Sequence, residues 1–161
     1  MKAPELQCCS VADLALQHSN GPEHTTQLAR ELAASLKPGD VILLEGELGA
    51  GKSTFARALI QALCGENTEV PSPTFTLVQT YETARFPVSH YDLYRLKRSS
   101  ELDELGLEEA LDDGAALIEW PERAEDRLPS DALRVHLLAD NERCATMAGP
   151  ARWRGLEAAY V

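Results

Sequence analysis

One motif, Gly-Glu-Leu-Gly-Ala-Gly-Lys-Ser-Thr at residues 46–54, constrains this chain more than any other feature. It fits G-x-x-x-x-G-K-[ST], the pattern of the phosphate-binding P-loop. The apolar run 41–44 predicts a buried strand before it, and the apolar spacing over 55–63 predicts a helix after it that stops at Gly65. A strand, a glycine-rich loop and a helix in this order favour a triphosphate site over a simple glycine-rich turn at a strand end.

The residue types of this P-loop motif match the charge and shape of a triphosphate. Glycines let the backbone curve around the phosphates with its N–H groups pointing inward, and the helix N-terminus adds further donors and a positive dipole end. We expect Lys52 to reach the β- and γ-phosphates and Ser53 to ligate Mg²⁺ through its hydroxyl. Thr54 could add a hydroxyl near the α-phosphate or simply pack in the first helical turn. The predicted phosphate-binding residues are Gly46, Gly49, Ala50, Gly51, Lys52, Ser53 and Thr54.

A P-loop site also needs a carboxylate beside the hydrated magnesium ion, usually at the end of a neighbouring apolar strand. Glu119 ends the apolar run 115–119, and Asp92 ends the run 88–92. Either residue could instead be a solvated strand end. The P-loop motif favours a place near the site for both, and the more apolar run makes Glu119 the better metal ligand.

Three further positions allow a functional and a structural interpretation. Thr74, in the loop 72–75 after the predicted P-loop helix, could meet the γ-phosphate or its magnesium when that loop closes, or belong to an ordinary proline-rich loop. Trp120 could flank the nucleotide base or be a partly buried core residue. His90 could act as a base, although a hydrogen-bonded core histidine is the simpler interpretation.

Length, charge and cysteine spacing limit the functional classes. A chain of 161 residues suits one domain, with the motifs concentrated in a core over 25–145. The formal net charge of −11 argues against a protein that grips RNA alone, because phosphate neutralisation dominates such binding. No apolar run approaches membrane-spanning length, and the four cysteines fit neither a zinc site nor a disulfide framework. We therefore expect a cytoplasmic protein without a membrane partner.

Strand-like and helix-like segments alternate along the rest of the chain. This order predicts an α/β fold, a P-loop NTPase-like three-layer sandwich whose mixed sheet is parallel near the P-loop and partly antiparallel elsewhere. The expected strands are 74–81, 88–93, 115–120 and 133–138, the expected helices are 25–36 and an acidic one over 101–111, and the tail through Trp153 and Tyr160 could hold a final strand and a short helix.

Five motifs in a fixed order resemble a known family. They are 46–54, Ser-Pro-Thr-Phe-Thr-Leu-Val at 72–78, His-Tyr-Asp-Leu-Tyr-Arg-Leu at 90–96, Glu-Leu-Asp-Glu-Leu-Gly at 101–106 and Ile-Glu-Trp-Pro-Glu at 118–122. The set is similar to the bacterial TsaE family, also called YjeE. Each later motif is short, but five in order at compatible spacing are specific, and the match covers 41–129 with looser extensions to Thr25 and Arg143.

The resemblance implies a small Mg²⁺-dependent ATPase that acts with the TsaB and TsaD proteins. By this resemblance, the three proteins would together make threonylcarbamoyladenosine at adenosine 37 of tRNAs that read ANN codons. TsaD would perform the transfer, and this chain would contact tRNA only through the complex. It also implies roles for individual residues. Ser53, where the family commonly has threonine, and Glu119 would ligate Mg²⁺, Asp92 would be needed for activity at the metal site, and Trp120 would lie near the nucleotide. Thr25 and Arg143 would contact the nucleotide at the two ends of the match.

Other functional classes remain as alternatives. A small-molecule P-loop kinase needs an acceptor pocket and often an arginine-bearing lid, for which Arg123 and Arg127 are the lid-like pair. A GTP switch lacks support, because no Asn-Lys-x-Asp guanine motif occurs in the chain. The intact Lys52, Ser53 and Glu119 argue against a binding module that holds ATP without turnover, without excluding it. Because no positioned base or arginine finger is evident, we expect hydrolysis by the lone chain to be slow and stimulated by partners.

Overall fold

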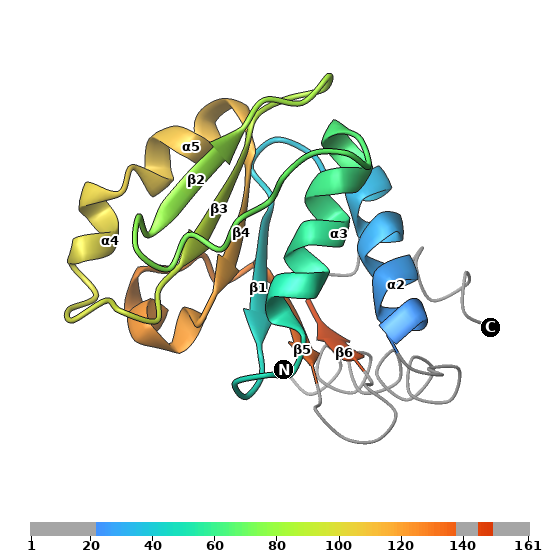
Figure 1. Cartoon of the computed structure of the whole chain (residues 1–161). Coiled ribbons are helices and arrows are strands. Elements are labelled where there is room, and N and C mark those ends of the chain that lie inside the picture. The colour runs from blue at the N-terminus through green and yellow to red at the C-terminus, as the bar shows by residue number, and fades with distance from the viewer. Residues whose placement is uncertain (1–21, 138–144, 150–161) are drawn as a thin grey trace.

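The computed structural model describes residues 22–137 and 145–149 (Figure 1). The strands within these ranges form one six-stranded sheet in the order β2-β3-β4-β1-β5-β6. They are β1 (Val41–Glu45), β2 (Val78–Tyr81), β3 (Val88–Asp92), β4 (Ala115–Glu119), β5 (Leu133–Leu137) and β6 (Ala145–Ala148). The four inner strands are parallel, and β2 and β6 pair antiparallel at the two edges, which confirms the predicted mixed sheet.

Helices cover both faces of this sheet, as predicted for a three-layer sandwich. Among the described residues, the helices are α2 (Pro22–Ser35), α3 (Lys52–Cys64), α4 (Glu101–Glu104), α5 (Leu107–Asp113) and the 3-10 helix η1 (Pro121–Arg127). Figure 1 shows α2 and α3 side by side against one face, with α4 and α5 on the opposite side. Helices on both faces require central strands that are buried on both sides, and β4 is buried along its whole length.

Successive side chains of β1 pack alternately into two separate hydrophobic cores. Ile42 and Leu44 belong to the core beneath α2 and α3, whereas Val41 and Leu43 belong to the core beneath α4, α5 and η1. The strand period of two sends successive side chains to opposite faces. This explains why the apolar run before the P-loop motif is continuous rather than alternating.

The structure corrects two predicted elements. The acidic helix expected over 101–111 is two short helices, because Gly106 adopts a left-handed conformation with φ 73° between α4 and α5. The strand expected over 74–81 begins only at Val78. Its first residues form a turn in which the Leu77 N–H donates to the Pro73 carbonyl at 2.6 Å, with Leu77 itself at φ 70°.

The remaining predicted elements occur close to their expected bounds. Gly65 ends α3, as expected, with its N–H bonded to the carbonyl of Gln61. The final strand of the tail corresponds to β6, whereas the short helix expected beyond it lies outside the described residues. Within the part of the chain that the structure describes, none of the helices has the length and apolar character to cross a membrane.

One arginine of the β2–β3 connection fixes the end of α2. The guanidinium of Arg85 donates from Nη1 to the carbonyl of Ala33 at 2.9 Å and from Nη2 to the carbonyl of Leu36. The last carbonyls of a helix have no partner within the helix, and a cation there also favours the negative end of the helix dipole. Arg85 therefore joins the edge of the sheet to the helix that packs against α3.

Candidate functional site

The P-loop motif forms the connection between β1 and α3. Gly46 has φ 144°, and a Cβ at this position would lie 2.6 Å from the carbonyl oxygen of Leu137. Gly51 caps the N-terminus of α3 in a left-handed conformation with φ 103°. Residues with side chains rarely adopt these conformations, so the glycines at these positions allow the loop to turn tightly into the helix.

A cavity of about 410 Å³ lies against this loop. Four segments that are distant in sequence line it: the P-loop motif, the loop 72–74, the end of β3 and the end of β4. The lining residues that the sequence predicted are Gly49, Gly51, Lys52, Ser53, Thr54, Thr74, Asp92, Glu119 and Trp120. Parallel strands end at one edge of the sheet, and Asp92 and Glu119 are paired neighbours there, which is why both carboxylates reach the same cavity.

Glu119 is held between the start of α3 and the neighbouring strand. The Ser53 hydroxyl lies 3.5 Å from Glu119 Oε1, and His90 Nε2 lies 2.6 Å from Glu119 Oε2. His90 and Glu119 are both buried, and His90 is thus the hydrogen-bonded core histidine of the simpler sequence interpretation. The carboxylate therefore presents one oxygen to Ser53 while the other is bound to the imidazole.

Lys52 is folded back onto its own loop. Its Nζ donates to the carbonyls of Gly46 and Glu47, the second at 3.0 Å, and lies 3.8 Å from the ring centroid of Trp120. Burial lowers the pKa of the Lys52 ammonium, and the nearby Glu119, among other carboxylates, partly offsets this effect. A phosphate in the cavity would supply the negative charge that this buried cation lacks.

Asp92 binds the loop that follows α3. Its Oδ2 accepts hydrogen bonds from the Thr74 hydroxyl at 3.0 Å and the Ser72 hydroxyl at 3.4 Å. Its Oδ1 accepts the backbone N–H of Tyr94 at 3.0 Å. The loop 72–75 is thus fastened to the end of β3 by the carboxylate that was predicted to lie near the metal.

Trp120 and Tyr94 form an aromatic wall of the cavity. Their ring centroids are 5.0 Å apart, and Trp120 adopts φ 59°, a left-handed conformation that is strained for a bulky residue. Strained backbone of this kind is common at functional sites. Tyr94 was missed by the sequence analysis, although its place two residues after Asp92 puts it just beyond the same strand end. Leu48, also missed, lines the cavity and is 80% exposed.

Several predicted site residues lie outside the cavity lining. Gly46 and Ala50 shape the loop without lining the cavity. Thr25 is in the first turn of α2, but its side chain is outside what the structure describes, and Arg143 lies in the undescribed segment 138–144.

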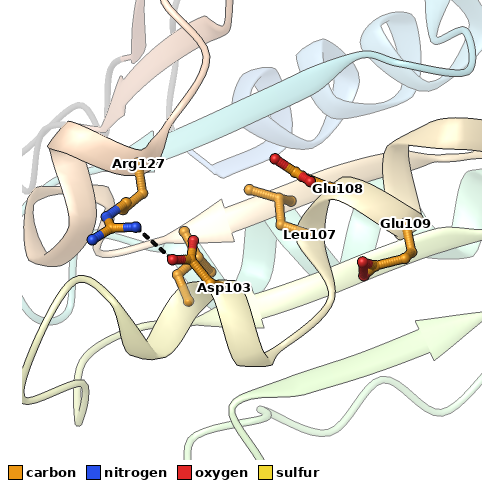
Figure 2. Close-up of a pocket in the computed structure, with 6 residues that line it drawn as sticks. Asp103, Leu107, Glu108, Glu109 and Arg127 are labelled. Carbon is orange, nitrogen blue, oxygen red and sulfur yellow. Dashed lines mark hydrogen bonds and ion pairs between the residues drawn. The ribbon is translucent and has the colours of Figure 1, made fainter.

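The two lid-like arginines of the kinase alternative do not line this cavity. Arg127 pairs with Asp103 of α4 at the rim of a separate cavity of about 370 Å³, whose other polar lining residues are Glu108 and Glu109 (Figure 2). Arg123 lies over the ring of Tyr94, 5.5 Å from its centroid. Neither arginine is among the residues that line the cavity at the P-loop motif.

The fold and this site together define a protein of the P-loop NTPase-like α/β class. A sequence model described as "Threonylcarbamoyl adenosine biosynthesis protein TsaE" matches residues 19–146. The chain therefore belongs to the TsaE family, whose members serve in threonylcarbamoyladenosine biosynthesis on tRNA.

Individual relatives support this assignment over most of the chain. The tRNA threonylcarbamoyladenosine biosynthesis protein TsaE of Rickettsia felis is 50% identical over 130 residues, covering 80% of this chain and 76% of the relative. The protein of the same name from Bacillus subtilis is 42% identical over 125 residues, covering 76% and 77% of the two chains. The crystal structure of Bacillus subtilis YdiB superposes with a TM-score of 0.68 at 34% identity, covering 87% of this chain and 88% of YdiB.

Proposed function

We propose that this chain is a Mg²⁺-dependent P-loop ATPase that hydrolyses ATP slowly and acts with TsaB and TsaD in forming threonylcarbamoyladenosine on tRNA. The observation that carries the proposal is the meeting of the P-loop motif with Glu119, whose Oε1 lies 3.5 Å from the Ser53 hydroxyl at the start of α3. A hydroxyl on the first turn of a P-loop helix beside a strand-end carboxylate is the arrangement that holds magnesium in P-loop NTPases.

The loop would bind the phosphates through its backbone N–H groups and the N-terminus of α3. Lys52 would exchange the carbonyls of Gly46 and Glu47 for the β- and γ-phosphates, since a charged acceptor forms a stronger hydrogen bond than a neutral one. Trp120, which now contacts the ammonium, would be uncovered by that movement and left beside the nucleotide.

The residues present fit a magnesium ion. Magnesium keeps several waters and uses few protein ligands, so Ser53 and Glu119, with Asp92 nearby, would hold it together with the phosphates. When bound, the ion would neutralise charge on the β- and γ-phosphate oxygens. No group of three or more His, Cys, Asp or Glu side chains that could hold a metal by itself occurs among residues 22–137 and 145–149. In the proposed site, the phosphates of the nucleotide would supply the remaining ligands of the ion.

Slow hydrolysis follows from what the cavity lacks. Its lining within the described residues contains no arginine, and both carboxylates already have hydrogen-bond partners. A partner protein would then supply or position the missing groups. The net charge of −11 supports contact with tRNA through TsaB and TsaD rather than directly, and a role in tRNA modification would place the chain in the cytoplasm.

Reconstitution of tRNA modification tests the proposal. Purified TsaB, TsaD and unmodified tRNA would be incubated with an activated threonylcarbamoyl donor, ATP and Mg²⁺. Three parallel reactions would contain the wild-type chain, the Lys52→Ala variant, or neither. We expect threonylcarbamoyladenosine, measured by mass spectrometry of nucleosides, only with the wild type. Lys37→Ala, at an exposed lysine, is the matched control. Full modification with Lys52→Ala would contradict the proposal.

The small-molecule kinase remains the alternative, although neither Arg123 nor Arg127 lines the cavity. Transfer of the γ-phosphate to a metabolite rather than to water would favour it. A chromatographic search for phosphorylated products from labelled ATP and a metabolite mixture distinguishes the two. Competition of GTP with ATP in the same assay tests whether the site prefers adenine or guanine nucleotides.

A further inference from the structure

The buried contact between His90 and Glu119 has no assigned role in the site described above. His90 is in the middle of β3, and Glu119 ends the adjacent parallel strand β4. The strand period places His90 on the same face as Asp92, and that face is turned toward α3 and the P-loop motif. His90 and Glu119 are 1% and 2% exposed, so solvent does not compete for their 2.6 Å contact.

The surroundings of the imidazole determine where its proton lies. His90 Nδ1 is buried and has no hydrogen-bond partner among the residues that the structure describes. A proton on Nδ1 would be a buried donor without an acceptor, which costs more than an unpaired acceptor nitrogen. The imidazole therefore carries a proton on Nε2 and donates it to Glu119 Oε2.

This hydrogen bond gives the two carboxylate oxygens of Glu119 different partners. The terminal torsion of a glutamate is broad, so an unrestrained carboxylate would turn freely about its last bond. With Oε2 bound to the imidazole, Oε1 is the oxygen left facing the Ser53 hydroxyl at 3.5 Å. The same oxygen is then the one available to a cation between Ser53 and Glu119.

We propose that His90 is a positioning residue that fixes Glu119 Oε2 and thereby presents Oε1, together with Ser53, to the magnesium ion of a bound nucleotide. The inference rests on the proposed function, because it concerns the metal of that same site. Hydrogen-bond partners of metal-ligating side chains orient the ligand and commonly change metal affinity by about 10- to 100-fold when removed. His90 would act in this way without touching the ion.

The test compares Mg²⁺-dependent and Mg²⁺-independent binding of the fluorescent analogue mant-ATP. His90→Leu removes the donor, and His90→Gln keeps an N–H that can reach the carboxylate. His136→Leu is the control, since His136 is a half-exposed histidine of β5. Thermal unfolding followed by circular dichroism verifies that each variant is folded.

We expect His90→Leu to raise the Mg²⁺ concentration needed for half-maximal binding by about 10-fold or more. Binding of mant-ATP in EDTA should stay within about twofold of wild type, a difference of about 0.4 kcal/mol. His90→Gln should recover most of the Mg²⁺ response, and His136→Leu should match the wild type. An unchanged Mg²⁺ response in His90→Leu, or an equal loss with and without Mg²⁺, would overturn the inference.

A second measurement uses only the wild-type protein without nucleotide, so it does not depend on the folding of a variant. Long-range ¹H–¹⁵N correlation spectra of the wild-type protein report the tautomer of each of its four histidines. We expect the Nε2–H form for His90, and the Nδ1–H form would overturn the inference. A wild type that binds mant-ATP without any response to Mg²⁺ would instead contradict the proposed metal-dependent function, which keeps the two failures distinct.

Discussion

Asp92 Oδ2 accepts a hydrogen bond from the Thr74 hydroxyl at 3.0 Å, and this contact fastens the loop after α3 to the end of β3. The carboxylate also accepts the hydroxyl of Ser72 and the backbone N–H of Tyr94. One side chain thus joins the loop 72–75 to the end of β3, beyond which Tyr94 of the aromatic wall lies. A ligand that draws either Asp92 or Thr74 toward itself has to replace this contact.

Removal of the Asp92 carboxylate should loosen that loop. In Asp92→Ala the hydroxyls of Ser72 and Thr74 lose their shared acceptor, and a hydrogen bond to a charged group contributes about 1.5–3 kcal/mol. We expect faster amide hydrogen exchange in peptides covering 72–78, measured by mass spectrometry, and reduced ATP hydrolysis. Thr76→Ala, an exposed threonine of the same loop, is the control. Exchange in Asp92→Ala that equals the wild-type rate would contradict the role of the contact.

Lys52 should lower the free energy of unfolding of the protein in the absence of nucleotide. Its pKa is lowered by burial, so the unfolded chain binds this proton more tightly than the folded chain does, and stability rises with pH between the folded pKa and the ordinary value of 10.5. We therefore expect Lys52→Met to be more stable than wild type near neutral pH while losing triphosphate binding. The advantage should shrink as the pH approaches 10.5. Urea unfolding at several pH values measures this, and an advantage that grows with pH would refute it.

Arg85 should stabilise the C-terminal end of α2. Arg85→Ala removes two donors to the carbonyls of Ala33 and Leu36, and we expect a loss of about 1.5–3 kcal/mol in the free energy of unfolding. Arg85→Lys should recover only part, because an ammonium lacks the planar fork of a guanidinium. Denaturant unfolding followed by circular dichroism provides the values. A change below about 0.5 kcal/mol, the size of an ordinary surface substitution, would show that the cap is unimportant.

An ion-pair network should support the base of the P-loop motif. Arg134 of β5 pairs through Nη2 with Glu125 of η1 at 2.6 Å and through Nη1 with Glu45, the last residue of β1, and these contacts raise the pKa of the guanidinium. The groups are partly exposed, so we expect Arg134→Met to cost only about 1 kcal/mol. A double-mutant cycle with Glu125→Gln isolates the pair. Its coupling energy should fall at about 1 M salt, where charges are strongly screened; a salt-independent coupling would indicate packing instead.

Local sequence patterns were sufficient to predict the elements whose conformation depends mainly on residues close together in the chain. The apolar run 41–44 and the glycines of the P-loop motif predicted β1, the loop and α3, because a strand buried on both faces and a tight turn each demand particular residue types. The runs ending at Asp92 and Glu119 predicted two strand ends at one edge. The break of the acidic helix was missed because Gly106 fits a helical pattern at modest cost and only its left-handed backbone reveals the interruption.

The sequence by itself determined the P-loop motif, the inner strands that flank it and the two carboxylates able to serve it, since each depends on residues close together in the chain. Only the tertiary structure decided which partners those side chains have. Strand register places His90 against Glu119, the left-handed turn at Leu77 brings Thr74 to Asp92, and loop curvature folds Lys52 back onto Gly46. Such contacts join atoms that are far apart in the chain or set by backbone angles, and a one-dimensional pattern carries neither kind of information.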